Sequence, residues 1–152
     1  MNNQAPIIQI ETLSQSHLSV ISAMSVKLWD DCDVQEELKQ WESLIHSPKD
    51  FCALAVVDNQ YAGFIHVSVR SEYVEGVDAD KVAYLEGIYV EENFRYRQVA
   101  STLLAASEAW AKSLGLSQMA SDTDLGNTGS QQFHLVSGFK EVIQIVCYVK
   151  DL

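Results

Sequence analysis

Positive charge is scarce in this sequence. Of its 152 residues, 10 are Lys or Arg and 21 are Asp or Glu, which gives a formal net charge of -11 at pH 7. Arginine occurs three times, at Arg70, Arg95 and Arg97. A chain this acidic repels nucleic acid and anionic lipid and attracts cationic ligands. We therefore expect no nucleic-acid or membrane partner; the alternative is that the acids only keep the protein in solution.

Cysteine pairs and long apolar runs are also missing. Cys32, Cys52 and Cys147 are odd in number and no C-x-x-C pair occurs, so neither a zinc site nor a disulfide framework is predicted. Free, buried thiols are typical of a reducing cytoplasm. No apolar run approaches the ~20 residues of a membrane-spanning helix, and the start of the chain lacks the basic and apolar blocks of a signal peptide. We expect a cytoplasmic protein without a metal.

What the sequence does contain is the apolar patterning of one mixed α/β domain, residues 1–152. The periodicity and the turn residues predict elements of both kinds. Strands are expected at 6–13, 51–57, 61–70, 82–90, 117–123 and 141–149. Helices are expected from Ser14 or Ser16 to Leu28, and at 34–45, 99–114 and 127–138.

Two of the three arginines stand between the strand expected at 82–90 and the helix expected at 99. The N–H groups at the start of a helix have no intrahelical partner and lie at the positive end of its dipole. Guanidinium groups pair bidentately with phosphate oxygens. The stretch therefore predicts an anion site; the alternative is that Arg95 and Arg97 neutralise Glu91 and Glu92 on a solvated face.

The same stretch resembles the Gcn5-related N-acetyltransferase superfamily, because residues 95–100, RYRQVA, match its pattern [RQ]-x-x-G-x-[GA] with one mismatch. The blocks SEYVEG, YLEGIYV, EAWAK, ASDTDLGN and HLVSGF, and LW followed by acids near residue 29, resemble the aminoglycoside 6′-N-acetyltransferases. The resemblance covers roughly residues 25–148. It implies a mostly antiparallel sheet flanked by helices, with strands 4 and 5 splayed, and direct acetyl transfer from acetyl-CoA to the 6′-amine of an aminoglycoside.

The resemblance also implies a set of cofactor-binding residues. Backbone groups of Ile88, Tyr89 and Val90 would pair with pantetheine, and Asn127 would contact the cofactor arm, its alternative role being a helix N-cap. Residues of one loop would hold the pyrophosphate: Arg95, Tyr96, Arg97, Gln98, Val99, Ala100 and Ser101. Gln98 stands where the pattern has glycine. We expect a negative φ at Gln98, a side chain that points away from the phosphates, and reduced cofactor binding.

On the substrate side, the resemblance implies that Trp29, Tyr73, Glu86 and Asp122 line the aminoglycoside site. Glu86 lies within an apolar strand, where an unpaired carboxylate would be costly, so it should face a cleft; the alternative is a structural salt bridge. Asp122 ends a strand, where an Asx turn or helix cap is the alternative. Trp29 alone would more often belong to the core.

Three residues are candidates for proton transfer. Glu86 or Asp122 could accept the proton of the substrate ammonium group, directly or through water. His134 stands where many superfamily members have a tyrosine near the leaving thiolate, and it could protonate that thiolate; a helix-surface or core histidine is the alternative. No nucleophilic triad and no metal constellation occurs in the sequence, which favours direct transfer.

Two other functions remain open from the sequence. One is an acetyltransferase for another amine, on a polyamine or a protein, and the other is a non-catalytic CoA-binding module, favoured only by Gln98. The apolar stretch EVIQIVCYV at 141–149 and the sheet edges could pair between subunits. Because members of the resembling branch are often dimers, we expect a homodimer.

Overall fold

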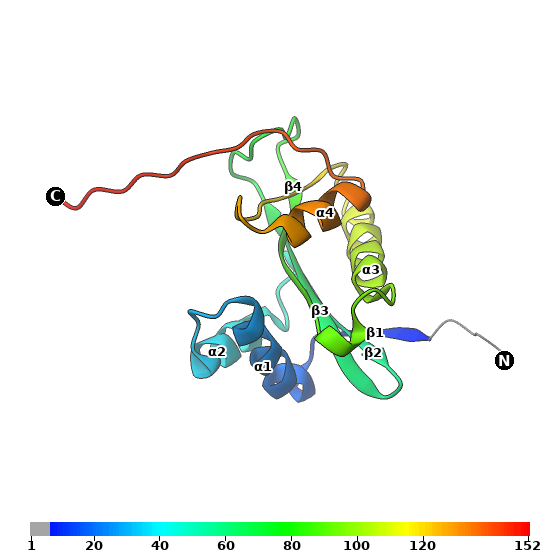
Figure 1. The fold of residues 1–152 in the computed structure, drawn as a ribbon. Coiled ribbons are helices and arrows are strands. Elements are labelled where there is room, and N and C mark those ends of the chain that lie inside the picture. Colours follow the sequence, from blue (N-terminus) through cyan, green and yellow to red (C-terminus); the bar gives the residue numbers. More distant parts are fainter. Residues whose placement is uncertain (1–6) are drawn as a thin grey trace.

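A five-stranded sheet forms the centre of the protein in the computed structural model, which describes residues 7–152 (Figure 1). The strands follow one another in the sheet in chain order, β1-β2-β3-β4-β5. Pairing is antiparallel from β1 to β4, and β5 runs parallel to β4. The bounds are β1 Ile8–Thr12, β2 Asp50–Val57, β3 Gln60–Arg70, β4 Val82–Val90 and β5 Met119–Ser121.

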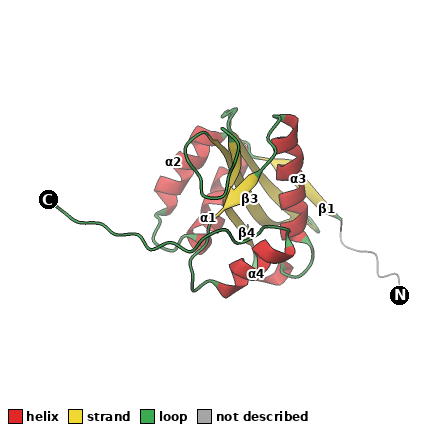
Figure 2. Cartoon of the chain, turned by 90° about the horizontal axis from the view of Figure 1, so that it is seen from above, coloured by secondary structure: helices red, strands yellow, loops and turns green. Residues whose placement is uncertain are grey.

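Helices cover both faces of this sheet. Viewed from above, α1 and α2 lie on one face and α3 on the other, while α4 lies near the β4 end (Figure 2). The bounds are α1 Leu18–Leu28, α2 Val34–Leu44, α3 Val99–Ser113 and α4 Thr128–Val136, with 3-10 turns at Gln15–His17 and Glu92–Phe94. The mixed α/β fold with a mostly antiparallel sheet is thus confirmed. Within residues 7–152, no helix is long and apolar enough to cross a membrane.

Local sequence signals account for several of these boundaries. The β2–β3 hairpin turns at Asp58 and Asn59, whose φ values of 50 and 61 match the two left-handed positions of a tight primed turn. Asp33 caps α2 by accepting from the N–H groups of Gln35 and Glu36. Gly115, with φ 78, follows the end of α3 as a C′ glycine should.

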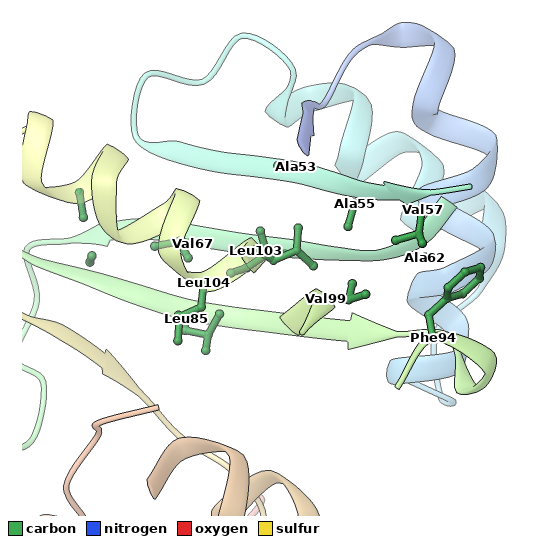
Figure 3. Close-up of a cluster of buried hydrophobic side chains, with 13 residues drawn as sticks. Ala53, Ala55, Val57, Ala62, Val67, Leu85, Phe94, Val99, Leu103 and Leu104 are labelled. Atoms are coloured by element: carbon green, nitrogen blue, oxygen red, sulfur yellow. The ribbon is translucent and has the colours of Figure 1, made fainter. Parts of the chain in front are cut away.

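Each face of the sheet carries its own core. On the α3 side, Leu103 and Leu104 pack over small strand residues such as Ala53 and Ala55 and over Leu85 (Figure 3). On the other side, the helices α1 and α2 pack against Phe64 and neighbouring strand residues, with the Trp41 ring 5.4 Å from the Phe64 ring. Because both faces are packed, the sheet is a rigid platform for side chains at its ends.

The last two strands part after a short contact. β4 pairs with β5 only from Ala83 to Leu85, opposite Met119 to Ser121, and β4 then continues to Val90 without a neighbour on that side. The splay implied by the family resemblance is therefore present. It leaves an open strand edge directly before the loop that leads into α3.

The expected strand at 141–149 is wrong for this chain. Residues 139–152 have no regular secondary structure, and they leave the body as an extended tail (Figures 1 and 2). Apolar side chains of this tail, among them Ile145 and Val146, are exposed. Extended backbone becomes a strand only when an edge pairs with it, and no strand among residues 7–152 does so.

The thiols also differ from the expectation of buried cysteines. All three are free, but only Cys52 is buried, whereas Cys32 is half-buried and Cys147 is exposed on the tail. Burial raises the pKa of the Cys52 thiol to about 12. Cys147 is therefore the thiol open to reagents.

Candidate active site

A β-bulge sets the position of Glu86. In the β3–β4 ladder, His66 pairs with Gly87 and Val67 pairs with Leu85, so Glu86 is an extra residue without a partner on β3. Leu85 and Ile88 both pack on the α3 side, so Glu86 and Gly87 lie together on the face of α1 and α2. The Glu86 side chain is a quarter exposed. That Glu86 faces a cleft stays a prediction.

Glu86 does not stand alone. Arg70, the last residue of β3, donates from Nε to Oε1 at 3.0 Å and from a terminal nitrogen to Oε2 at 2.8 Å. Ser68 donates its hydroxyl to Oε1 at 2.6 Å. The alternative, in which Glu86 forms a salt bridge, is therefore observed: its partner is Arg70. The Glu86 carboxylate raises the pKa of Arg70 above its usual value, because it bonds the charged form.

Asp122 lies beside this pair and is joined to it through Tyr84. The Tyr84 hydroxyl donates to Asp122 Oδ1, and the Arg70 guanidinium lies over the Tyr84 ring, with Cζ 3.4 Å from the centroid. Burial, together with the hydrogen bond to Asp122, raises the pKa of Tyr84, so the hydroxyl stays a donor at neutral pH. The chain of contacts thus runs from Glu86 through Arg70 and Tyr84 to Asp122.

Trp29 forms the wall next to these acids. It is the C-cap residue of α1 and is half-buried. Its ring lies so close to Gly87 that a Cβ there would be 2.5 Å from Cζ2 of the indole. Glycine at position 87 is what lets the indole lie against β4, beside Glu86. Trp29 thus lies beside Glu86, and its part in lining the aminoglycoside site stays a prediction.

Tyr73 is not brought into this cluster. It lies on the loop between β3 and β4, where its side chain is exposed and its hydroxyl donates to Glu75 at 3.0 Å. The nearby Glu75 raises the pKa of Tyr73. Its place as a sugar-stacking residue stays a prediction.

His134 reaches the splay through a serine. Its Nδ1 lies 2.7 Å from the carbonyl oxygen of Ser130, so this nitrogen must carry the proton. Nε2 lies 2.9 Å from Oγ of Ser121, which is also 3.3 Å from the Leu85 carbonyl oxygen. In the neutral ring, Nε2 accepts the single hydroxyl hydrogen of Ser121, which is then not available to the Leu85 carbonyl oxygen; in the imidazolium form, Nε2 donates to Oγ and the hydroxyl donates to Leu85. His134 is thus tied to the last residue of β5, where β4 and β5 part.

The open edge of β4 offers backbone groups to a ligand. Glu91 donates its N–H to Ala62 of β3, so by strand alternation Tyr89 also bonds toward β3, while Ile88 and Val90 turn toward the splay. Arg95 donates from Nε to the Val90 carbonyl oxygen at 3.0 Å. The free groups of Ile88 are those best placed for an amide-bearing arm.

The loop before α3 begins with an unexpected backbone conformation. Gln98 is the N-cap residue of α3 and has φ 64 and ψ 11, a left-handed conformation, so the expected negative φ is wrong. Tyr96, with φ 61, is left-handed as well. The turn into the helix needs this conformation at position 98, which explains why the family pattern has glycine there.

The start of α3 still fits a phosphate-bearing ligand. The N–H groups of Val99, Ala100 and Ser101 belong to the first helical turn, which has no intrahelical acceptors for them. The carbonyl oxygen of Gln98 accepts from the hydroxyls of Ser101 and Thr102, so both side chains fold back to the helix start. Amides with the positive end of the helix dipole are the donor set that a pyrophosphate needs.

The arginines do not pair with the acids that precede them. Nη2 of Arg97 lies 3.5 Å from Oδ2 of Asp58, and Cζ of Arg97 lies 5.4 Å from the centroid of the Phe94 ring. Glu91 instead accepts from Lys27 at 2.6 Å, which raises the pKa of that lysine. The alternative in which Arg95 and Arg97 neutralise Glu91 and Glu92 is therefore not the observed pairing.

Asn127 has its alternative role in the structure. Its Oδ1 accepts from the N–H of Ser130 at 3.0 Å, as an N-cap of α4 does. A contact with the cofactor arm stays a prediction. Within residues 7–152, no group of three or more His, Cys, Asp or Glu side chains is arranged to hold a metal ion.

The sequence did not predict four residues that contact Glu86, Asp122 or His134, or that link them: Ser68, Arg70, Tyr84 and Ser121. A signal for Arg70 existed, since it is one of only three arginines and stands on the strand that pairs with the one bearing Glu86. The bulge at Glu86 has no sequence signature.

Relatives with known activities share this architecture. An aminoglycoside N(6′)-acetyltransferase type 1 of Salmonella typhimurium is 34% identical over 143 residues, which cover 94% of this chain and 99% of the relative. The solved aminoglycoside N-acetyltransferase AAC(6′)-Iy in complex with CoA superposes with a TM-score of 0.92, at 32% identity and 100% coverage of both chains. Another AAC(6′)-Iy structure, in complex with the bisubstrate analogue CoA-S-monomethyl-acetylneamine, gives 0.90 at 33% identity, covering 96% of this chain and 99% of the other.

A family match agrees with these likenesses. Residues 13–139 match the acetyltransferase (GNAT) family, and this range contains every side chain of the cluster and the loop into α3. The chain belongs to the acetyltransferase (GNAT) family, in the branch that contains the aminoglycoside N(6′)-acetyltransferases.

Proposed function

We propose that this protein transfers the acetyl group of acetyl-CoA to the 6′-amine of an aminoglycoside, directly and in a ternary complex. One observation carries the proposal: two carboxylates and the free amides of a helix start lie at the two ends of the edge that β4 leaves open. The carboxylates of Glu86 and Asp122 lie at one end of the splay. The open edge of β4 leads from there to the helix-start amides of α3.

Acetyl-CoA would lie along this edge. Its pyrophosphate would bind the N–H groups of Val99, Ala100 and Ser101, with Arg97 supplying positive charge in an otherwise acidic chain. Its pantetheine amides would pair with the free backbone groups of Ile88. The thioester would then lie at the level of Leu85 and Ser121, within reach of an amine held by the acids.

The chemistry follows from this placement. The neutral 6′-amine attacks the thioester carbon, the C–S bond breaks, the nitrogen gives up one N–H proton to solvent as the amide forms, and the CoA thiolate takes up a proton. The amine must first lose the proton of its ammonium form, and Asp122 is the better acceptor because only one of its oxygens is used, by Tyr84. In its imidazolium form, His134 would pass the proton of Nε2 to Oγ of Ser121 while the Ser121 hydroxyl gives its own proton to the thiolate, and the ring would end neutral.

Thiol release tests the proposal. Kanamycin, which carries a 6′-amine, should release CoA from acetyl-CoA, and paromomycin, which carries a 6′-hydroxyl, should release little, since only the amine attacks. A Cys147→Ser variant removes the exposed thiol that would react with the detecting reagent. Equal release with the two antibiotics would contradict the 6′ assignment.

The other candidate functions differ in the same assay. An acetyltransferase for another amine would release CoA with spermidine or a lysine peptide and not with kanamycin. A non-catalytic module would bind acetyl-CoA in calorimetry and release no thiol with any amine. The branch relatives favour the aminoglycoside over both.

We also propose a homodimer. The tail at 141–149 carries Ile143, Ile145 and Val149 on one side and Val142 and Val146 on the other, and all of these are exposed in the single chain. A segment with apolar side chains on both faces is suited to lie within a sheet, and a second copy would offer it a strand edge to pair with.

The dimer has a direct test. Light scattering at micromolar concentration should give twice the mass of 17.0 kDa. Ile145→Asp should reduce the mass to that of the monomer, and the neighbouring Gln144→Ala should not. A monomeric wild-type protein would contradict the proposal.

Two further assignments complete the proposal. Residues 1–152 act as one acetyltransferase domain, because the two acids and the helix-start loop all lie around one sheet. The protein acts in the cytoplasm, where acetyl-CoA is available and where free thiols such as Cys52 and Cys147 stay reduced.

A further inference from the structure

The carboxylate of Glu86 accepts more hydrogen bonds than the carboxylate of Asp122. Its Oε1 accepts from Ser68 at 2.6 Å and from Arg70 Nε at 3.0 Å, while Oε2 accepts from Arg70 at 2.8 Å. An ionised carboxylate offers about four acceptor positions. Three are used, so one position remains, and it belongs to Oε2.

Arg70 is itself held in place. Its guanidinium lies over the Tyr84 ring, with Cζ 3.4 Å from the centroid, and Tyr84 is anchored by its hydroxyl to Asp122. Two parallel hydrogen bonds and a stacked ring fix the plane of the guanidinium, although its side chain is 38% exposed. Because the guanidinium holds both oxygens of the Glu86 carboxylate, the direction of the remaining acceptor position on Oε2 is fixed as well.

We propose that Arg70 is a positioning residue for acetyl transfer: it fixes the Glu86 carboxylate so that Oε2 accepts a single N–H from one ammonium group of the substrate. This rests on the proposed function. Glu86 then orients the substrate, and Asp122, which has more acceptor positions open, takes the proton. Arg70 stays on Glu86 during binding and is not displaced by the incoming cation.

Steady-state kinetics of Arg70→Lys tests whether Arg70 acts through its hydrogen-bond geometry or only through its positive charge. Arg70→Lys keeps the positive charge and loses the forked geometry. It should lower kcat/KM for kanamycin about tenfold, the loss expected for a misplaced charge-assisted contact, and leave the Kd of acetyl-CoA unchanged. Unaltered kcat/KM with active wild-type enzyme would overturn the inference while the proposed function stands. No turnover by the wild type would instead overturn the proposed function.

A double-mutant cycle shows whether Arg70 acts through Glu86. In a Glu86→Gln background, Arg70→Lys should change kcat/KM for kanamycin less than about twofold, because the group that it positions is already neutral. A loss as large as in the wild-type background would mean that Arg70 acts elsewhere. Loss of acetyl-CoA affinity in step with kcat/KM would mean a general structural role, and either outcome overturns the inference.

A spectroscopic readout does not depend on turnover. With only three arginines, the Nε–H signal of Arg70 can be assigned in a ¹⁵N-labelled sample by its loss in Arg70→Lys. The signal should persist when kanamycin is added to saturation. Its disappearance on saturation would show that the substrate displaces Arg70, and the positioning role would be wrong.

Discussion

Replacing Gln98 by glycine should strengthen acetyl-CoA binding and stabilise the protein at the same time. Gln98 has φ 64 at the N-cap of α3, next to the amides proposed to hold the pyrophosphate. A left-handed backbone costs a residue with a Cβ about 1–2 kcal/mol. Glycine lacks this cost, and it lets a phosphate approach the backbone more closely.

The two effects have different sizes. For stability, relief of the strain is opposed by the larger unfolded-state entropy of glycine, about 0.4–1 kcal/mol, so the net gain should be near 1 kcal/mol or less. In a chain of this length this corresponds to a rise in Tm of about 2–4 °C at most. For binding, one better hydrogen bond to a charged phosphate is worth about 1.5–3 kcal/mol, so the Kd of acetyl-CoA should fall at least tenfold.

Tyr96 provides a matched control. It has φ 61 and is fully exposed, so Tyr96→Gly should relieve a similar strain two residues away. Thermal unfolding should show a similar shift for both variants, whereas calorimetric titration with acetyl-CoA should show tighter binding for Gln98→Gly only. Gln98→Ala keeps the left-handed strain and shortens the side chain. It therefore separates an effect of the backbone conformation from an effect of side-chain length.

Two results would refute this reasoning. If Gln98→Gly leaves the Kd unchanged, the loop does not hold the pyrophosphate in the way proposed. If Gln98→Ala tightens binding as much as Gln98→Gly, the length of the glutamine side chain and not the backbone conformation limits access.

Three other predictions concern the site and the core. Glu86→Gln and Asp122→Asn should each lower kcat/KM for kanamycin at least about tenfold, without change in acetyl-CoA affinity, and an equal loss of cofactor affinity in calorimetry would contradict their place in the substrate site. Gly87→Ala places a Cβ 2.5 Å from Trp29 and should destabilise the protein by about 1–3 kcal/mol in urea unfolding; no loss would mean that the indole moves freely. Because burial raises the pKa of Cys52 to about 12, the folded state keeps that proton longer, and the free energy of unfolding should fall as pH rises from about 9 toward 12. Cys52→Ala should show a shallower fall over this window, and an unchanged slope would contradict the assignment.

Much of the fold followed from short-range patterns. The hairpin at Asp58 and Asn59 and the ends of α3 and α4 were predictable because turn and cap residues act within a few positions of one another. The helix expected at 34–45 was predictable in extent, and its apolar side chains Leu38, Trp41 and Ile45 pack in the core. Its first turn departs from the apolar pattern, since Val34 is exposed and Glu37 is buried.

The sequence predicted which residue types form the site, but not the contacts between them. Glu86 and Asp122 were expected to line one site, and the structure links them through Arg70 and Tyr84. The one-residue register shift beside Glu86 could not be foreseen, because periodicity does not reveal such a shift. The left-handed Gln98 was missed because a residue with a Cβ argues against that conformation, although the glycine of the family pattern pointed to it.

The bulge in β4 has a consequence for how this enzyme can evolve. Before the bulge, Leu85 packs against α3, and after it Ile88 and Val90 do the same, because the extra residue resets the alternation of the strand. Deletion of Glu86 would bring Gly87 directly after Leu85, still opposite His66, and would keep Ile88 and Val90 on the α3 side and Tyr89 on the α1 side. The chain could therefore lose position 86 during evolution and keep its core, and the only side chain lost would be the carboxylate of the site.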